Sequence, residues 1–180
     1  EAVDQDADPA TSEGIYVEAL PATVATLAVG QQVRVEGVVS EQYGRTHLDA
    51  LGVAICAESV TVPEATPITL PLTNPDATEG MLVTLPQELS VLETYRFAQY
   101  GEISIGTERQ FQPTALAAPG SSEAAAIAAS NAANRIILDD ARSAQNADPA
   151  LHPNGQPFTL DNLLRGGDTV ANVIGILDYG

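Results

Sequence analysis

A chain of 180 residues is long enough to bury a hydrophobic core in one domain or in two small ones. Its 24 acidic residues outnumber 7 basic ones, all of them arginine, so the net charge is −17 at pH 7. This charge opposes sequence-independent binding to nucleic acid, which depends on neutralising phosphates, and it favours solubility, cation binding and adaptation to salty surroundings. No apolar run reaches the length of about 18 residues that a membrane-spanning helix needs, so we expect no membrane partner.

The first half of the chain predicts short strands joined by turns. Residues 14–19 have the composition of a strand, and residues 33–39 begin with the alternation of apolar and charged side chains that marks a sheet with one buried face. Gly37 within this run indicates a bulge or a sharp bend. Residues 42–45 predict a turn, after which residues 46–48 return as the second strand of a hairpin.

The single cysteine, Cys56, excludes a disulfide within the chain. Because Cys56 ends the apolar run 53–56, we interpret it as a small buried hydrophobic residue rather than a reactive thiol. The segment that follows, residues 58–72, is rich in Thr, Val and Pro. It predicts an edge strand followed by an extended linker, because proline is excluded from central strands.

The second half predicts further short strands, one helix and one long loop. Turn residues separate four strand-like runs, at residues 79–83, 88–93, 102–105 and 110–112. An alanine-rich segment, about residues 121–135, is a strong helix former that Ser121 or Ser122 can cap. A buried strand is expected at 135–140, a long polar loop at about 141–167, and a last strand at 169–178.

These elements predict a mainly β fold of the barrel or sandwich type, in two related β units. We expect residues 1–72 to form a first unit with its linker, and residues 73–180 to form a second unit that contains the helix. Glu-Gly followed by an apolar residue occurs at both 13–15 and 79–81, which supports two related units.

The acidic N-terminus is a candidate calcium site, formed by Asp4, Asp6, Asp8 and Glu13. Calcium binds several carboxylate oxygens, and alternate aspartates in a loop can surround one ion. The spacing differs from an EF-hand, because Pro9 stands where that loop requires Gly and Ile15 where it requires Glu. The alternative is a solvated acidic terminus.

The sequence shows no complete catalytic site. Asp139 and Asp140 at a strand end are candidates for Mg²⁺, but adjacent strand residues point to opposite faces, so we favour a role in capping the following loop. The only histidines, His47 and His152, have no recognisable nucleophile or zinc-ligand partner.

Arginine and aromatic side chains occur together in two segments. One contains Tyr43 and Arg45, and the other contains Tyr95, Arg96, Phe97 and Tyr100. Single-stranded nucleic acid binds by stacking on aromatic rings beside arginines, so both segments are candidate DNA-binding surfaces. The alternative is ordinary strand packing with tyrosine hydroxyls at the surface.

Short motifs follow one another in order over nearly the whole chain, at residues 8–17, 29–41, 79–83, 93–95, 100–103, 112–114, 135–140 and 167–170. Their order resembles the region upstream of the catalytic domain in bacterial extracellular nucleases of the ExeM/NucH type. The resemblance implies OB-like barrel modules in a secreted bacterial protein. It also implies that the chain is a fragment, incomplete at both ends, of a protein whose separate domain cleaves DNA with Mg²⁺ or Mn²⁺.

The resemblance leaves two functions open. The chain would be a non-catalytic accessory module that positions DNA for its own nuclease domain, or an acidic spacer stabilised by salt or Ca²⁺ without nucleic-acid binding. One departure concerns the first alternative: the family tends to carry Gly-Arg where this chain has Ala98 and Gln99, which removes a cation from a candidate DNA-facing turn.

Overall fold

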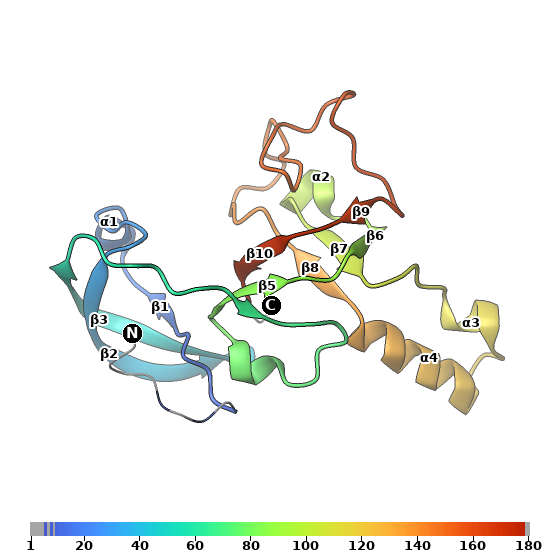
Figure 1. Ribbon diagram of the computed structural model, residues 1–180, viewed down its shortest axis with the longest axis horizontal. Coiled ribbons are helices and arrows are strands. Elements are labelled where there is room, and N and C mark those ends of the chain that lie inside the picture. The colour runs from blue at the N-terminus through green and yellow to red at the C-terminus, as the bar shows by residue number, and fades with distance from the viewer. Residues whose placement is uncertain (1–5, 7, 9, 179–180) are drawn as a thin grey trace. The chain divides into compact units, whose positions relative to one another are not determined.

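The computed structural model describes residues 6, 8 and 10–178. These residues form a mainly β fold, as predicted, with short strands gathered into sheets of three, three and four strands (Figure 1). The sheets stay open and do not close into the barrels that the sequence predicts. Most strands outside the long hairpin have only two to five residues, whereas barrel closure needs tilted strands that pair around the whole circuit.

The chain divides into two compact units. The first draws on residues 1–67, 74–84 and 174–180, and the second on residues 68–73 and 85–173. Each unit therefore uses segments from both sides of residues 72–73, where the sequence predicts a boundary between β units.

A long hairpin is the main element of the first unit. β2 (Gln32–Gln42) and β3 (Arg45–Ala57) pair antiparallel around Tyr43 and Gly44, whose φ angles of 55° and 85° suit a two-residue hairpin turn. β1 (Tyr16–Glu18) adds to the free edge of β3 in parallel orientation. The predicted strands and turn are confirmed, although β3 continues well beyond residue 48.

The predicted bulge at Gly37 is also confirmed, because the register of β2 against β3 shifts between Glu36 and Gly37. A Cβ atom at Gly37 would lie 2.3 Å from the carbonyl oxygen of Asp49, so a larger residue would force the two strands apart. The bulge therefore brings β2 unusually close to β3 beside Asp49.

Cys56 is exposed, so the prediction of a buried cysteine is wrong. β1 pairs with β3 only as far as Asp49, and the end of β3 that carries Cys56 pairs with β2 alone. An apolar run in such a ribbon keeps part of its surface in solvent, as the exposed neighbours Ala54 and Ile55 show.

The remaining elements of the first unit are short. α1 (Pro21–Val24) begins at a proline, and the 3₁₀ helix η1 (Pro75–Thr78) does the same. A small sheet in the order β10-β5-β4 joins β4 (Thr66–Pro67), β5 (Leu82–Leu85) and β10 (Val173–Ile176), and it lies mainly in this unit.

The second unit is built on a four-stranded antiparallel sheet in the order β8-β7-β6-β9. Its strands are β6 (Leu89–Glu93), β7 (Ile103–Gly106), β8 (Ile136–Leu138) and β9 (Thr169–Val170). The short helix α2 (Phe97–Tyr100) connects β6 to β7. Leu89, Ile103 and Ile105 are the largest fully buried side chains among the described residues, so the core of the unit lies on one face of this sheet.

The predicted alanine-rich helix is α4 (Ser122–Ala133), preceded by the single turn α3 (Pro113–Leu116). Ser121 caps α4 as predicted, because its Oγ accepts a hydrogen bond of 3.1 Å from the amide of Ala124. The strand expected at residues 110–112 does not form. Instead, the Gln110 side chain donates to the carbonyl oxygens of Asn131 and Asn134 at the end of α4.

The long polar loop is confirmed, since residues 141–167 contain no helix and no strand beyond two isolated bridges. Among the described residues, no helix has the length and hydrophobicity needed to cross a membrane.

Candidate functional site

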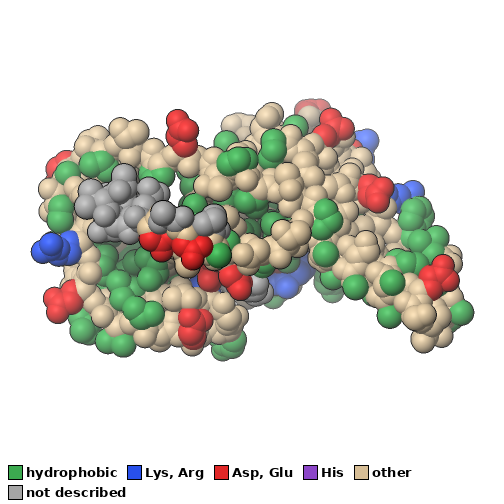
Figure 2. Space-filling view, turned by 60° about the horizontal axis from the view of Figure 1, so that its bottom comes forward, with side chains coloured by type: hydrophobic (Ala, Val, Ile, Leu, Met, Phe, Trp, Pro, Cys, Tyr) green, Lys and Arg blue, Asp and Glu red, His purple; other side chains and the backbone are tan. Residues whose placement is uncertain are grey.

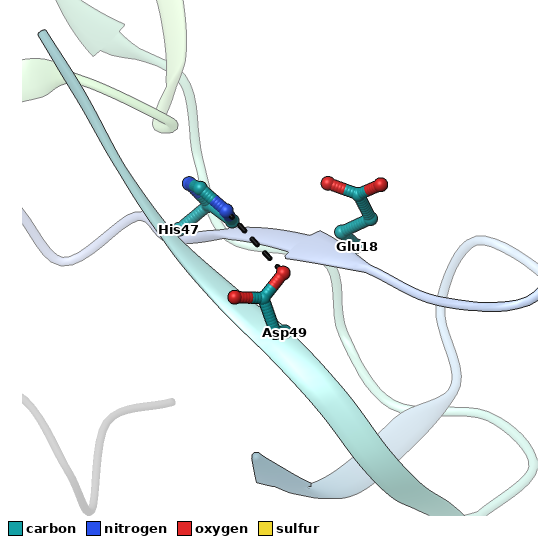
Figure 3. Close-up of side chains that lie close together, drawn as sticks. All are labelled: Glu18, His47 and Asp49. Carbon is teal, nitrogen blue, oxygen red and sulfur yellow. Dashed lines mark ion pairs between the residues drawn. The ribbon is translucent and has the colours of Figure 1, made fainter. Parts of the chain in front are cut away.

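Three side chains suited to metal binding meet on one face of the sheet formed by β1, β3 and β2 (Figure 3). His47 and Asp49 are two residues apart on β3 and share a face, while Glu18 on β1 lies opposite Asp49. One ligand atom from each residue lies within 4.8 Å of the other two. His47 is buried, and both carboxylates are exposed, so a solvated ion can reach the group.

Ser40 on β2 lies opposite His47 and orients this group. Its Oγ is 2.8 Å from Asp49 Oδ2 and 3.0 Å from His47 Nε2. Because a carboxylate can only accept, Ser40 donates its proton to Asp49, and its oxygen then accepts from the Nε2–H of His47. The other carboxylate oxygen, Asp49 Oδ1, lies 3.4 Å from the same ring nitrogen.

The geometry differs from that of a catalytic Ser-His-Asp triad. In a triad, the serine and the aspartate bind opposite nitrogens of the imidazole, which lets the ring accept the serine proton. Here Ser40 and Asp49 both approach Nε2 of His47, and Nδ1 is buried with no hydrogen-bond partner among the described residues. The arrangement therefore does not activate Ser40 as a nucleophile.

The N-terminal acidic candidates lie partly outside the described residues, since Asp4 is not described. The carboxylates of Asp6, Asp8 and Glu13 accept hydrogen bonds from nearby backbone amides, at 2.7 to 3.2 Å. Each of these three carboxylates therefore already has a local hydrogen-bond partner. Calcium binding by this segment stays a prediction.

The first arginine and aromatic segment has one free aromatic ring. Tyr43 at the hairpin turn is 91% exposed. Arg45 instead lies 3.9 Å over the ring of Tyr16, and its Nη1 is 3.0 Å from a carboxylate oxygen of Asp178. Arg45 therefore acts within the first unit, with its charge already compensated.

The second segment presents a different set of side chains. Tyr95 is 86% exposed, and Arg96 stacks 4.6 Å over the ring of Tyr100 while its Nε binds Glu102 at 2.9 Å. Phe97 is buried in an edge-to-face contact with Phe158, at 5.1 Å between ring centroids. Phe97 therefore offers no free ring face to a ligand, whereas Tyr95 does.

Tyr95 and Arg96 border an open pocket of about 230 Å³ on the outward face of the second unit's sheet. A row of one residue from each of three paired strands contributes to its lining: Glu93, Ser104 and Ile137. Arg135 also lines the pocket, where it pairs with Glu93 and donates to Ser104 Oγ at 2.7 Å.

The pocket is locally neutral in a strongly acidic chain. Its lining holds two arginines, Arg96 and Arg135, and two glutamates, Glu93 and Glu102. On the face shown in Figure 2, acidic side chains lie at many places and basic ones at few. The pocket is therefore a place where an anionic ligand meets less repulsion than the net charge of −17 suggests.

The remaining candidates have local structural contacts. Asp139 Oδ1 accepts from the amide of Ala141 at 2.7 Å, and Asp140 binds both the amide and the guanidinium of Arg142. These bonds support the interpretation that the two aspartates hold the start of the long loop. In that loop, His152 Nδ1 accepts from the amide of Asn154 at 3.1 Å.

Comparisons with models of known protein families, with curated proteins and with solved structures found no match. The resemblance to extracellular nucleases therefore stays a prediction from sequence motifs alone. The sequence predicts no partner for His47. It does not reveal Glu18, Ser40 and Asp49 as its neighbours, because these three residues lie on three different strands. The only local signal was His47 and Asp49 at the two-residue spacing of a strand.

Proposed function

We propose that this chain is a non-catalytic accessory module of a secreted bacterial nuclease. In this role it positions DNA for a phosphodiesterase domain that uses Mg²⁺ or Mn²⁺ and lies elsewhere in the protein. The ordered motifs support the nuclease context. The observation that carries the binding role is the pocket in which the exposed ring of Tyr95 adjoins Arg96 and Arg135.

The pocket suits single-stranded rather than double-stranded DNA. An unpaired base can stack on the free face of Tyr95, a contact that is sequence-tolerant because every base has an aromatic face. The guanidinium groups of Arg96 and Arg135 match the geometry of phosphate oxygens. A duplex hides its bases, so it would depend on charge alone, which the acidic chain disfavours.

The glutamates limit the strength of binding. Arg96 and Arg135 each pair with a glutamate, so a phosphate must compete for their donors. We therefore expect weak binding. Stacking supplies a large part of the binding free energy, and the arginines add a part that decreases with salt concentration. Such an affinity suits a module that presents DNA to another domain and then releases it.

Replacing Tyr95 with alanine is expected to weaken binding of a labelled single-stranded oligonucleotide by about 5- to 100-fold, because one base loses its stacking partner. Fluorescence anisotropy at low salt measures this change, and duplex of the same length should bind more weakly. Tyr43→Ala is the comparison variant, since Tyr43 is also exposed but lies on the hairpin turn of the first unit, where Arg45 is paired with Asp178. The Tyr95 variant should lose more affinity than the Tyr43 variant. Equal affinity of the Tyr95 variant and the parent, or no binding by the parent, would contradict the DNA-binding role.

The second candidate function is an acidic structural spacer that binds no DNA. The net charge of −17 and the neighbouring carboxylates of Asp6, Asp8 and Glu13 favour it. If the chain is such a spacer, its Tm should rise with NaCl, because salt screens repulsion among like charges. Millimolar CaCl₂ should raise it further than MgCl₂ of equal ionic strength, and Asp6→Asn with Asp8→Asn should remove the calcium-specific part. A Tm indifferent to both salts would exclude this function.

A further inference from the structure

The distance between His47 Nε2 and Asp49 Oδ1 matches the distance between two ligand atoms bound to one metal ion. Nε2 of His47 and Oδ1 of Asp49 are 3.4 Å apart, which is long for a hydrogen bond. Two ligand atoms that each lie about 2.0–2.1 Å from a tetrahedral zinc ion are separated by about 3.3–3.4 Å. The two atoms therefore already stand at the separation that one ion would impose.

The third ligand comes from the neighbouring strand. Glu18 lies opposite Asp49 in the parallel pairing of β1 with β3, and its carboxylate is within 4.8 Å of the other two ligand atoms (Figure 3). Since Glu18 is exposed, its side chain can change rotamer to complete the set without disturbing the core.

We infer that Glu18, His47 and Asp49 form a binding site for a divalent first-row transition-metal ion, with zinc as the best-fitting occupant. One imidazole and two carboxylates are a donor set that zinc accepts, with water in the remaining position. Calcium prefers six to eight oxygen ligands, so the imidazole selects against it. The inference stands independently of DNA binding, which involves other residues in the second unit.

The surroundings of the ligands set the expected affinity. Ser40 donates to Asp49 Oδ2 at 2.8 Å, which orients the carboxylate and leaves Oδ1 directed at the site. His47 is held by burial, with only 5% of its side chain exposed. Zinc at Nε2 requires the proton that Nε2 donates to Ser40 to move to Nδ1, which is buried with no acceptor among the described residues. Because an acceptor on the second ring nitrogen is commonly worth about 10- to 100-fold in affinity, we expect micromolar rather than nanomolar binding of zinc.

The ion would link a short strand to the hairpin. β1 is three residues long and is held to β3 by three register pairs. A metal bound by Glu18 on β1 and by His47 and Asp49 on β3 would fasten this strand to the hairpin. Binding to the folded state alone should therefore raise the Tm in proportion to the logarithm of the zinc concentration.

Isothermal titration of the full chain with ZnCl₂ tests the site, in a Cys56→Ser background because the exposed thiol is itself a zinc ligand. We expect one zinc ion per chain. Asp49→Asn and Glu18→Gln should each weaken binding at least about tenfold, by loss of a charged ligand. These exposed positions keep the test valid even if the buried His47 cannot be replaced without unfolding the chain.

Glu36→Gln is the matched control, since it removes the same charge from an exposed position of the same hairpin outside the cluster. Its zinc affinity should equal that of the background chain. Bound Co²⁺ should show visible absorption that Asp49→Asn abolishes. The inference is overturned if zinc binding is not saturable, or if the Glu36 and Asp49 variants lose zinc affinity equally. It is also overturned if equimolar calcium displaces the zinc.

Discussion

Replacing Ile105 with alanine is expected to lower the free energy of unfolding of the second unit by about 3–4 kcal/mol. Ile105 is fully buried on β7, a central strand of the four-stranded sheet. It lies opposite Val91 on β6 and Ile136 on β8, so truncation leaves a cavity that paired strands on both sides cannot close. Urea unfolding followed by far-UV circular dichroism measures the loss, because the chain has no tryptophan to report it.

Ile137→Ala is the matched control for this prediction. This substitution removes the same side-chain atoms from the neighbouring strand β8. Ile137 faces outward, however, and is 54% exposed. Replacing Ile137 should lower the free energy of unfolding by less than about 1 kcal/mol, since folding buries little apolar surface at this position. Equal losses in the two variants would mean that the inward face of this sheet is not the core of the unit.

The local elements of the fold could be predicted because their signals lie within a few residues. The alternation at residues 33–39 predicted β2, Gly37 predicted its bulge, and Ser121 predicted the start of α4. Each signal reflects a property of the backbone itself: side-chain alternation in a strand, the space left by a missing Cβ, and an unsatisfied amide at a helix start.

The remaining features depend on partners that are distant in sequence. Cys56 was expected to be buried because its neighbours are apolar, but only tertiary packing decides whether a strand is covered. Gln110 was expected in a strand, whereas it binds the carbonyl ends of a helix that follows it by more than ten residues. Barrel closure was expected from strand spacing, which contains no information on how the first and last strands pair.

The candidate sites divide in the same way. Exposed aromatic rings at Tyr43 and Tyr95 belong to segments that the sequence singles out. The ion pairs of Arg96 and Arg135 with glutamates are not predicted by any local pattern. The cluster of Glu18, His47 and Asp49 exists only because β1 pairs in parallel with β3. Parallel pairing joins segments about thirty residues apart, and no local pattern specifies its register.

One long-range contact has a counterpart in the sequence. Residues 13–15 and 79–81, which share the Glu-Gly motif, pack directly against each other in the first unit. The Ser12 hydroxyl donates to the carbonyl oxygen of Glu79, and Gly80 has a positive φ of 69°. The two glycines let these backbones approach more closely than any side chain permits.

Gly14→Ala is therefore expected to lower the free energy of unfolding of the first unit by about 3 kcal/mol, at the upper end of the cost of overpacking. The added Cβ would lie 2.3 Å from the carbonyl carbon of Gly80 and 2.5 Å from the amide nitrogen of Met81, which are backbone atoms that cannot rotate away. Gly52→Ala is the control, because a Cβ there meets no atom within 4 Å, and it should leave stability unchanged or raise it slightly. Thermal unfolding of both variants compares them under one condition. A Gly14 variant as stable as the Gly52 variant would show that the close contact between the two Glu-Gly segments does not stabilise the first unit. The similarity of the two segments would then not be explained by this contact.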